Sequence, residues 1–174
     1  KIPGGATLIF DVELIGFEKL AKKKWDLSTE EKKEKATERK AEGNAQFKEA
    51  NYAEALECYR ESLEYVSYLY EEEDKKATFD VNLGCNLNAA AVCLKLENFP
   101  EALKYCDEAL KLDEFSVKAM FRKSAALRNI GEPHKAKQEI MTAIKLDPKS
   151  GMLRKELAEV KKAIALDKQQ EKKL

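Results

Sequence analysis

The chain has 174 residues, 44% of them hydrophobic and 37% charged, and its 32 Lys and Arg balance its 32 Asp and Glu. This length suffices for one domain with its own core, and the scarcity of Gly (7) and Pro (4) favours long helices over a turn-rich β architecture. A net charge of zero gives no general attraction for nucleic acid, and no apolar run approaches the roughly 20 residues that span a bilayer. We therefore predict a mainly helical protein with no nucleic-acid or membrane partner.

The residue types needed for catalysis or metal binding do not occur in a usable pattern. The cysteines, at positions 58, 85, 93 and 106, form no CxxC pair, and His134 has no metal-ligand partner nearby in the sequence. No nucleophile, base and charge stabiliser are grouped together, and no Gly-rich phosphate loop is present. We expect no catalytic residue, no metal and no cofactor, with the cysteines as reduced, buried thiols of a cytoplasmic protein, or alternatively a nuclear one.

Residues 1–18 have a pattern of their own. Apolar residues alternate there with other side chains, at Ala6, Leu8, Phe10, Val12 and Leu14. This period of two, after a Pro-Gly-Gly turn, predicts one β-strand. No second run of this kind follows to pair with it, so the rest of its sheet lies outside the chain. We assign residues 1–18 to the end of another domain and residues 19–27 to a linker.

A helical repeat begins after the linker. Ser28 and Glu31 form a capping-box pattern that predicts a helix start. Beyond it, mostly small residues recur at offsets 0, 12, 16 and 19: Gly43, Ala55, Tyr59 and Ser62; Ala90, Ala102, Cys106 and Ala109; Ser124, Ala136, Ile140 and Ala143. The last two copies are 34 residues apart, the period of stacked helix pairs, while about 13 extra residues near positions 71–76 separate the first two. Three helix pairs, six helices in all, are predicted over residues 28–148.

The final segment, residues 149–174, keeps an apolar stripe at Leu153, Leu157, Val160 and Ile164. This spacing predicts a seventh helix that covers the open end of the third pair. An alternative is a basic amphipathic helix over residues 152–174 that binds calmodulin or acidic lipid.

Five polar residues fall on the first helices of the pairs, which line the concave wall of such an array. They are Lys40, Asn44, Asn88, Lys118 and Arg122, called below the five groove residues. Three cations and two amides suit a compact anion with two carboxylates, because each charge-assisted hydrogen bond contributes roughly 1.5 to 3 kcal/mol. The alternative is that they only solvate the groove. In either case we expect them to have no structural role.

The repeat spacing over residues 40–148 resembles the tetratricopeptide repeat, an all-α fold. Within it, the five groove residues resemble the two-carboxylate clamp of tetratricopeptide co-chaperones. In that family the clamp holds the C-terminal Glu-Glu-Val-Asp of Hsp90 and Hsp70. The resemblance implies that Lys40, Asn44 and Asn88 bind the terminal carboxylate, that Lys118 binds the last Asp side chain, and that Arg122 binds acidic groups upstream. Phe47 and Ala91 would flank the peptide's Val.

Residues 2–15 resemble the closing strand of the isomerase domain in FK506-binding-protein type immunophilins, and residues 19–26 resemble their linker. The resemblance implies that the longer protein is a peptidyl-prolyl isomerase co-chaperone. In this resemblance Phe10 matches an aromatic residue that lines the isomerase pocket. The other residues that line the pocket are absent, so we expect no isomerase activity from this chain. Its expected function is docking to the C-terminus of Hsp90, or of Hsp70. The alternative is a helical scaffold for calmodulin or another protein that makes no use of a clamp.

Overall fold

The computed structural model describes residues 23–67, 69 and 71–171, together with residues 4, 5, 7 and 13. The described residues contain helices only: the 3-10 turn η1 (Lys24–Asp26) and the α-helices α1 (Thr29–Lys48), α2 (Tyr52–Val66), α3 (Glu72–Lys95), α4 (Phe99–Leu112), α5 (Val117–Asn129), α6 (Pro133–Leu146) and α7 (Gly151–Glu171). The all-α prediction is confirmed. The predicted strand of residues 6–15 lies outside the described residues, apart from positions 7 and 13.

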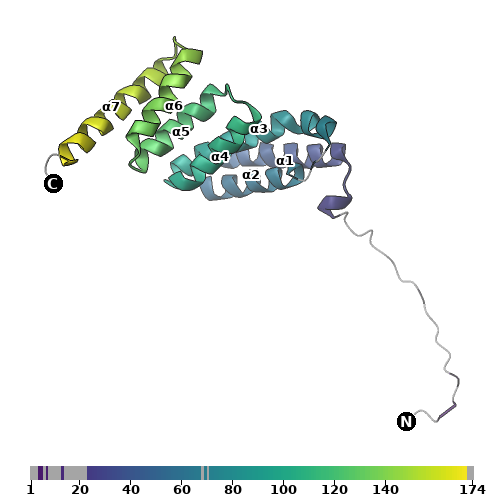
Figure 1. Cartoon of the computed structure of the whole chain (residues 1–174). Helices are drawn as coiled ribbons and strands as arrows, with labels where there is room; N and C mark the ends of the chain where they lie inside the picture. Colours follow the sequence, from purple (N-terminus) through teal and green to yellow (C-terminus); the bar gives the residue numbers. More distant parts are fainter. Residues whose placement is uncertain are drawn as a thin grey trace.

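The helices form a stack in which each one packs against the next along the chain (Figure 1). The hairpins α1 with α2, α3 with α4, and α5 with α6 are the three predicted pairs. In addition, α1 contacts α3, α3 contacts α5, and α5 contacts α7. The odd-numbered helices therefore form one continuous wall, as the repeat pattern requires.

Close helix approach explains the small residues of the repeat. All twelve residues identified from the offsets are buried. The tightest contact is at Gly43 in α1, where an added Cβ would lie 2.8 Å from Cε1 of Tyr59 and 3.2 Å from Cβ of Cys58. A larger residue at this position would push α1 away from α2.

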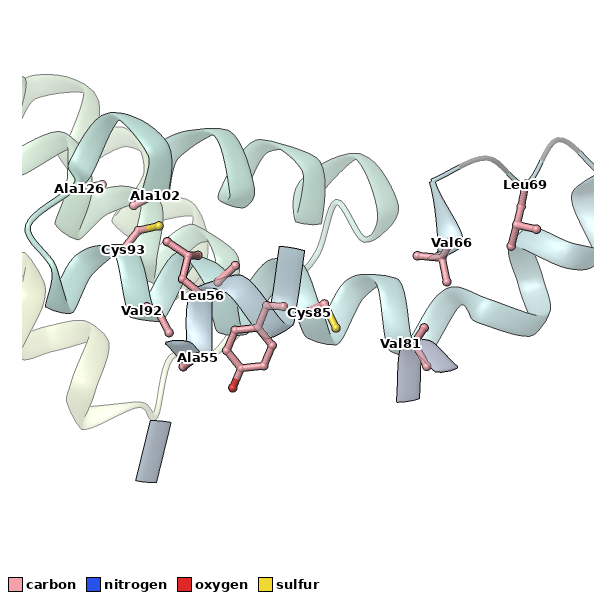
Figure 2. Packing of buried hydrophobic residues seen from close by; sticks show 13 residues of the cluster. Ala55, Leu56, Val66, Leu69, Val81, Cys85, Val92, Cys93, Ala102 and Ala126 are labelled. Carbon is pink, nitrogen blue, oxygen red and sulfur yellow. The ribbon is translucent and has the colours of Figure 1, made fainter. Parts of the chain in front are cut away.

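The extra residues between the first two repeats extend a helix and the core. They give α3 additional N-terminal turns, so that it has 24 residues where α5 has 13. Val81 on these turns packs with Val66 and Leu69 in the buried cluster that Figure 2 shows. The same cluster contains Cys85 and Cys93, and all four cysteines are buried. Burial raises the pKa of the Cys93 thiol to about 12, which makes it a core residue and not a nucleophile.

The last helix closes the stack. Leu153 and Val160 are fully buried against α5 and α6, so the predicted apolar stripe of α7 is covered. An ion pair that was not predicted from the sequence also joins α7 to the stack. Nε of Arg128 in α5 donates to Oε1 of Glu156 in α7 at 3.0 Å, and Nη2 donates to Oε2 at 3.4 Å. This two-point pair, with Glu156 buried, joins α7 to α5 beside the apolar contacts.

Gly43→Ala tests the close contact. The new methyl group meets a buried ring that cannot move, so overpacking of about 1 to 3 kcal/mol should outweigh the roughly 1 kcal/mol gained in helix propensity. Thermal unfolding followed by circular dichroism should show a lower melting temperature. The matched control is Gly84→Ala in α3, whose methyl group meets only the flexible end of Lys40. An equal fall in both variants would show that the contact with Tyr59 is unimportant.

Glu156→Ala tests the attachment of α7. It leaves the guanidinium of Arg128 partly buried without its carboxylate, so we expect a loss of about 2 kcal/mol in the free energy of unfolding. The control is Glu159→Ala, which breaks an exposed pair with Lys162 on the same helix and should change nothing measurable. Denaturant unfolding measures both variants, and equal stabilities would refute a role for the buried pair.

Candidate peptide-binding groove

The five groove residues all come from the wall of odd-numbered helices. Lys40 and Asn44 lie on α1, Asn88 lies on α3, and Lys118 and Arg122 lie on α5. Since α3 contacts both α1 and α5, these side chains belong to neighbouring helices of one surface.

The two amide residues are in direct contact. Nδ2 of Asn88 donates to Oδ1 of Asn44 at 2.9 Å, and the hydroxyl of Tyr59 donates to the same oxygen at 2.8 Å. Burial raises the pKa of Tyr59 to about 12, so its hydroxyl stays protonated and remains a donor. With its oxygen occupied twice, Asn44 has its NH2 group left to offer, and Asn88 keeps a second N–H. The pair is thus a set of donors suited to a carboxylate.

Arg122 is held against the neighbouring helix. Its Nη1 donates to the carbonyl oxygen of Leu87, the residue before Asn88, at 2.8 Å. Burial lowers the pKa of Arg122, because the charged form has lost part of its hydration. No carboxylate among the described residues pairs with it. A partly desolvated, unpaired guanidinium gains more from an incoming carboxylate than an exposed one does.

The two lysines differ in how they are held. Nζ of Lys40 donates to the carbonyl oxygen of Asp80 in α3 at 3.1 Å. Its side chain crosses Gly84, where an added Cβ would lie 2.8 Å from Cε of Lys40. Lys118 is exposed and makes no hydrogen bond or ion pair with the described part of the chain.

Some cations in the described part of the chain pair with acids, and others, the three groove cations among them, do not. Arg39, Arg60 and Arg128 each pair with a glutamate, and many of the other lysines pair with acids on their own helix. Lys40, Lys118 and Arg122 make no such pair within the described residues, although the chain holds as many acids as bases. The wall therefore presents positive charge with donors between the cations, which is the chemistry of an anion site.

The expectation that these residues lack a structural role is wrong for most of them. Lys40 links α1 to α3, the two asparagines do the same, and Arg122 links α5 to α3. The long side chains of Lys40 and Arg122 reach carbonyl oxygens of α3, and the two short asparagines meet because α1 and α3 are in contact. Lys118 makes no such link among the described residues.

The predicted pocket for an apolar peptide residue is less defined. Phe47 is partly buried and meets the ring of Tyr52 edge to face, with centroids 5.5 Å apart and planes at 60°. Ala91 is partly exposed on α3. A cavity of about 960 Å³ lies instead among α2, α3 and α4, and none of the five groove residues lines it.

Two residues that shape the groove were not predicted from the sequence to do so. Tyr59 was identified only as a member of the repeat register, yet its hydroxyl reaches Asn44. Gly84 was not singled out, although it makes room for the Lys40 side chain. The sequence contains one indication that Tyr59 has a further role: the other two repeats have Cys106 and Ile140 at the same offset, and neither of these carries a hydroxyl.

The family model of the tetratricopeptide repeat matches residues 117–150. Two similar relatives are the peptidyl-prolyl cis-trans isomerases FKBP4 of Homo sapiens and FKBP42 of Arabidopsis thaliana. FKBP4 is 34% identical over 177 residues, which cover all of this chain and 38% of the relative. FKBP42 is 34% identical over 174 residues, which cover 94% of this chain and 47% of the relative. The chain thus spans less than half the length of either protein.

Solved structures share the fold. The C-terminal tetratricopeptide-containing domain of a Plasmodium falciparum FK506-binding protein has a TM-score of 0.78 at 25% identity, covering 84% of this chain and 99% of that domain. The first such domain of Spaghetti (RPAP3), bound to the HSP90 peptide SRMEEVD, has a TM-score of 0.65 at 26% identity, covering 76% and 95%. The second domain of human RPAP3, in complex with the HSP70 peptide SGPTIEEVD, has a TM-score of 0.63 at 28% identity, covering 77% and 98%. The chain is a tetratricopeptide-repeat domain that matches the C-terminal region of the FK506-binding-protein type immunophilins FKBP4 and FKBP42.

Proposed function

We propose that the groove binds the acidic C-terminus of Hsp90, or of Hsp70, through its two terminal carboxylates. The observation that carries this proposal is the set of cations without carboxylate partners around a pair of amide donors. Lys40, Asn44 and Asn88 bind the main-chain carboxylate, since the two amides lie together on adjacent helices. Lys118 binds the side chain of the last Asp, and Arg122 binds acidic groups further upstream.

The solved neighbours support the class of partner. Two of them are tetratricopeptide domains that hold chaperone peptides, and both peptides end in Glu-Glu-Val-Asp. A clamp reads this shared terminus, so it accepts either chaperone, and contacts upstream of the terminus decide between them.

We further propose that the longer protein carries a peptidyl-prolyl isomerase domain before residue 19. The relatives FKBP4 and FKBP42 are such isomerases, and the match to FKBP4 covers the whole of this chain. In that arrangement the helical domain brings the isomerase to a chaperone and performs no chemistry itself.

The calmodulin alternative finds no support. Calmodulin binds the apolar face of an amphipathic helix. In α7 that face, with Leu153 and Val160 fully buried, is occupied by α5 and α6. The helix would have to leave the stack and break the pair between Arg128 and Glu156.

No described helix is long and apolar enough to cross a membrane.

Titration calorimetry with the peptide Met-Glu-Glu-Val-Asp tests the proposal. The few charge-assisted hydrogen bonds, less the cost of ordering the peptide, give an expected Kd on the order of 1 to 100 μM. Affinity should fall as salt is added, because exposed charges are screened. The control is the same peptide with an amidated C-terminus, which should bind at least tenfold more weakly. Equal affinities would refute the clamp.

Lys118→Ala and Arg122→Ala separate binding from stability. Lys118 makes no hydrogen bond or ion pair with the described part of the chain. Its replacement should therefore weaken peptide binding by about 1 kcal/mol and leave the melting temperature unchanged. Arg122→Ala should weaken binding by about 1 to 3 kcal/mol and also lower stability by about 1 kcal/mol, because the Leu87 carbonyl loses its donor. Calorimetric titration and thermal unfolding measure the two effects. If Lys118→Ala lowers the melting temperature and leaves binding intact, its assigned role is wrong.

A further inference from the structure

We propose that Tyr59 is a positioning residue of the groove: its hydroxyl fixes the side-chain amide of Asn44 with the NH2 group turned toward the peptide carboxylate. This inference rests on the proposed function and names a residue of the core, on α2, as part of the site.

Asn44 can bind a carboxylate in only one orientation of its side-chain amide. A side-chain amide has an acceptor end and a donor end, and only the donor end can bind a carboxylate. Turned the other way, Oδ1 of Asn44 would repel the bound anion. In the structure Oδ1 receives two hydrogen bonds, from Tyr59 at 2.8 Å and from Asn88 at 2.9 Å. Asn88 is itself an amide that can turn over. The hydroxyl of Tyr59 can donate or accept, but the buried ring fixes its place, and in the structure it donates to Oδ1 of Asn44.

The ring of Tyr59 cannot move away from this position. Its side chain is buried, with 1% of the residue exposed, and it packs against the backbone of α1 at Gly43, one residue before Asn44. The contact that sets the distance between α1 and α2 therefore also delivers the hydroxyl to the amide. Rotation of the ring would require the two helices to separate.

The three repeats differ at these two positions. Asn44 stands one residue after the small residue at offset 0, where the second and third repeats have Ala91 and Ala125. Tyr59 stands at offset 16, where they have Cys106 and Ile140. The repeat that has the amide is thus also the repeat that has the hydroxyl.

The test compares Tyr59→Phe with wild type in titrations of the full chain with Met-Glu-Glu-Val-Asp and with its C-terminal amide. Loss of one hydrogen bond that orients the amide should weaken binding of the free acid about three- to tenfold and leave the amidated peptide unchanged. The matched control is Tyr105→Phe, which removes a hydroxyl that accepts from Nε of Arg60 at 3.3 Å, away from the five groove residues. This control should change neither titration. Equal weakening toward both peptides would mean a general structural effect and would overturn the proposal.

A double-mutant cycle isolates the coupling. In an Asn44→Ala background the Tyr59→Phe change should have no further effect on binding, because the group that it orients is gone. A loss of the same size in both backgrounds would refute the positioning role. If wild type distinguishes free from amidated peptide but Tyr59→Phe binds as well as wild type, only this inference fails. If wild type does not distinguish the peptides, the proposed function fails, and this inference fails with it.

A measurement on the unaltered protein covers the case of an unstable variant. The two Nδ2 protons of Asn44 give separate NMR resonances. They should shift when the free-acid peptide is added and stay in place with the amidated peptide. Unchanged resonances under saturating free acid would show that the amide does not face the ligand.

Discussion

The close packing of α1 against α2 is the contact on which the groove depends. Because position 43 has no side chain, the ring of Tyr59 lies against the backbone of α1. That approach fixes the first helix pair, and the same ring carries the hydroxyl that bonds Asn44. Core packing and the orientation of a groove side chain are therefore set by one contact. We therefore expect a change at either residue to affect both stability and peptide binding.

The groove also depends on cations that the fold leaves without acids. The chain has equal numbers of acidic and basic residues, and some of its positive side chains, such as Arg60 and Arg128, pair with a glutamate. Lys40 and Arg122 instead bond main-chain carbonyl oxygens of α3, at Asp80 and Leu87. A carbonyl holds a cation in place without neutralising it, so the charge stays available to a ligand. The bond from Arg122 places its guanidinium in advance, which would reduce the ordering cost if a peptide binds there.

The helix pairs were predictable because helix packing selects small residues at regular offsets, and Gly43, Ala90 and Ser124 recur in that register. Contacts that depend on how one helix pair packs on the next could not be predicted from the sequence. The bond from Arg122 to Leu87 and the pair between Arg128 and Glu156 join helices far apart in sequence, and no spacing rule records them. The hydroxyl of Tyr59 was missed for another reason: its ring already explained the position as core. The groove residues were found from their helix positions and from family resemblance, and the sequence did not show that they also join the helices.

A structure of the chain in complex with Met-Glu-Glu-Val-Asp would show where the peptide's carboxylates bind. We expect the terminal carboxylate within hydrogen-bond distance of Nζ of Lys40 and of the Nδ2 atoms of Asn44 and Asn88, with Oδ1 of Asn44 still bonded to Tyr59. The ammonium of Lys40 should then have exchanged the Asp80 carbonyl for the peptide. A peptide bound elsewhere, or a terminal carboxylate exposed to solvent while these donors keep their present partners, would refute binding through the five groove residues.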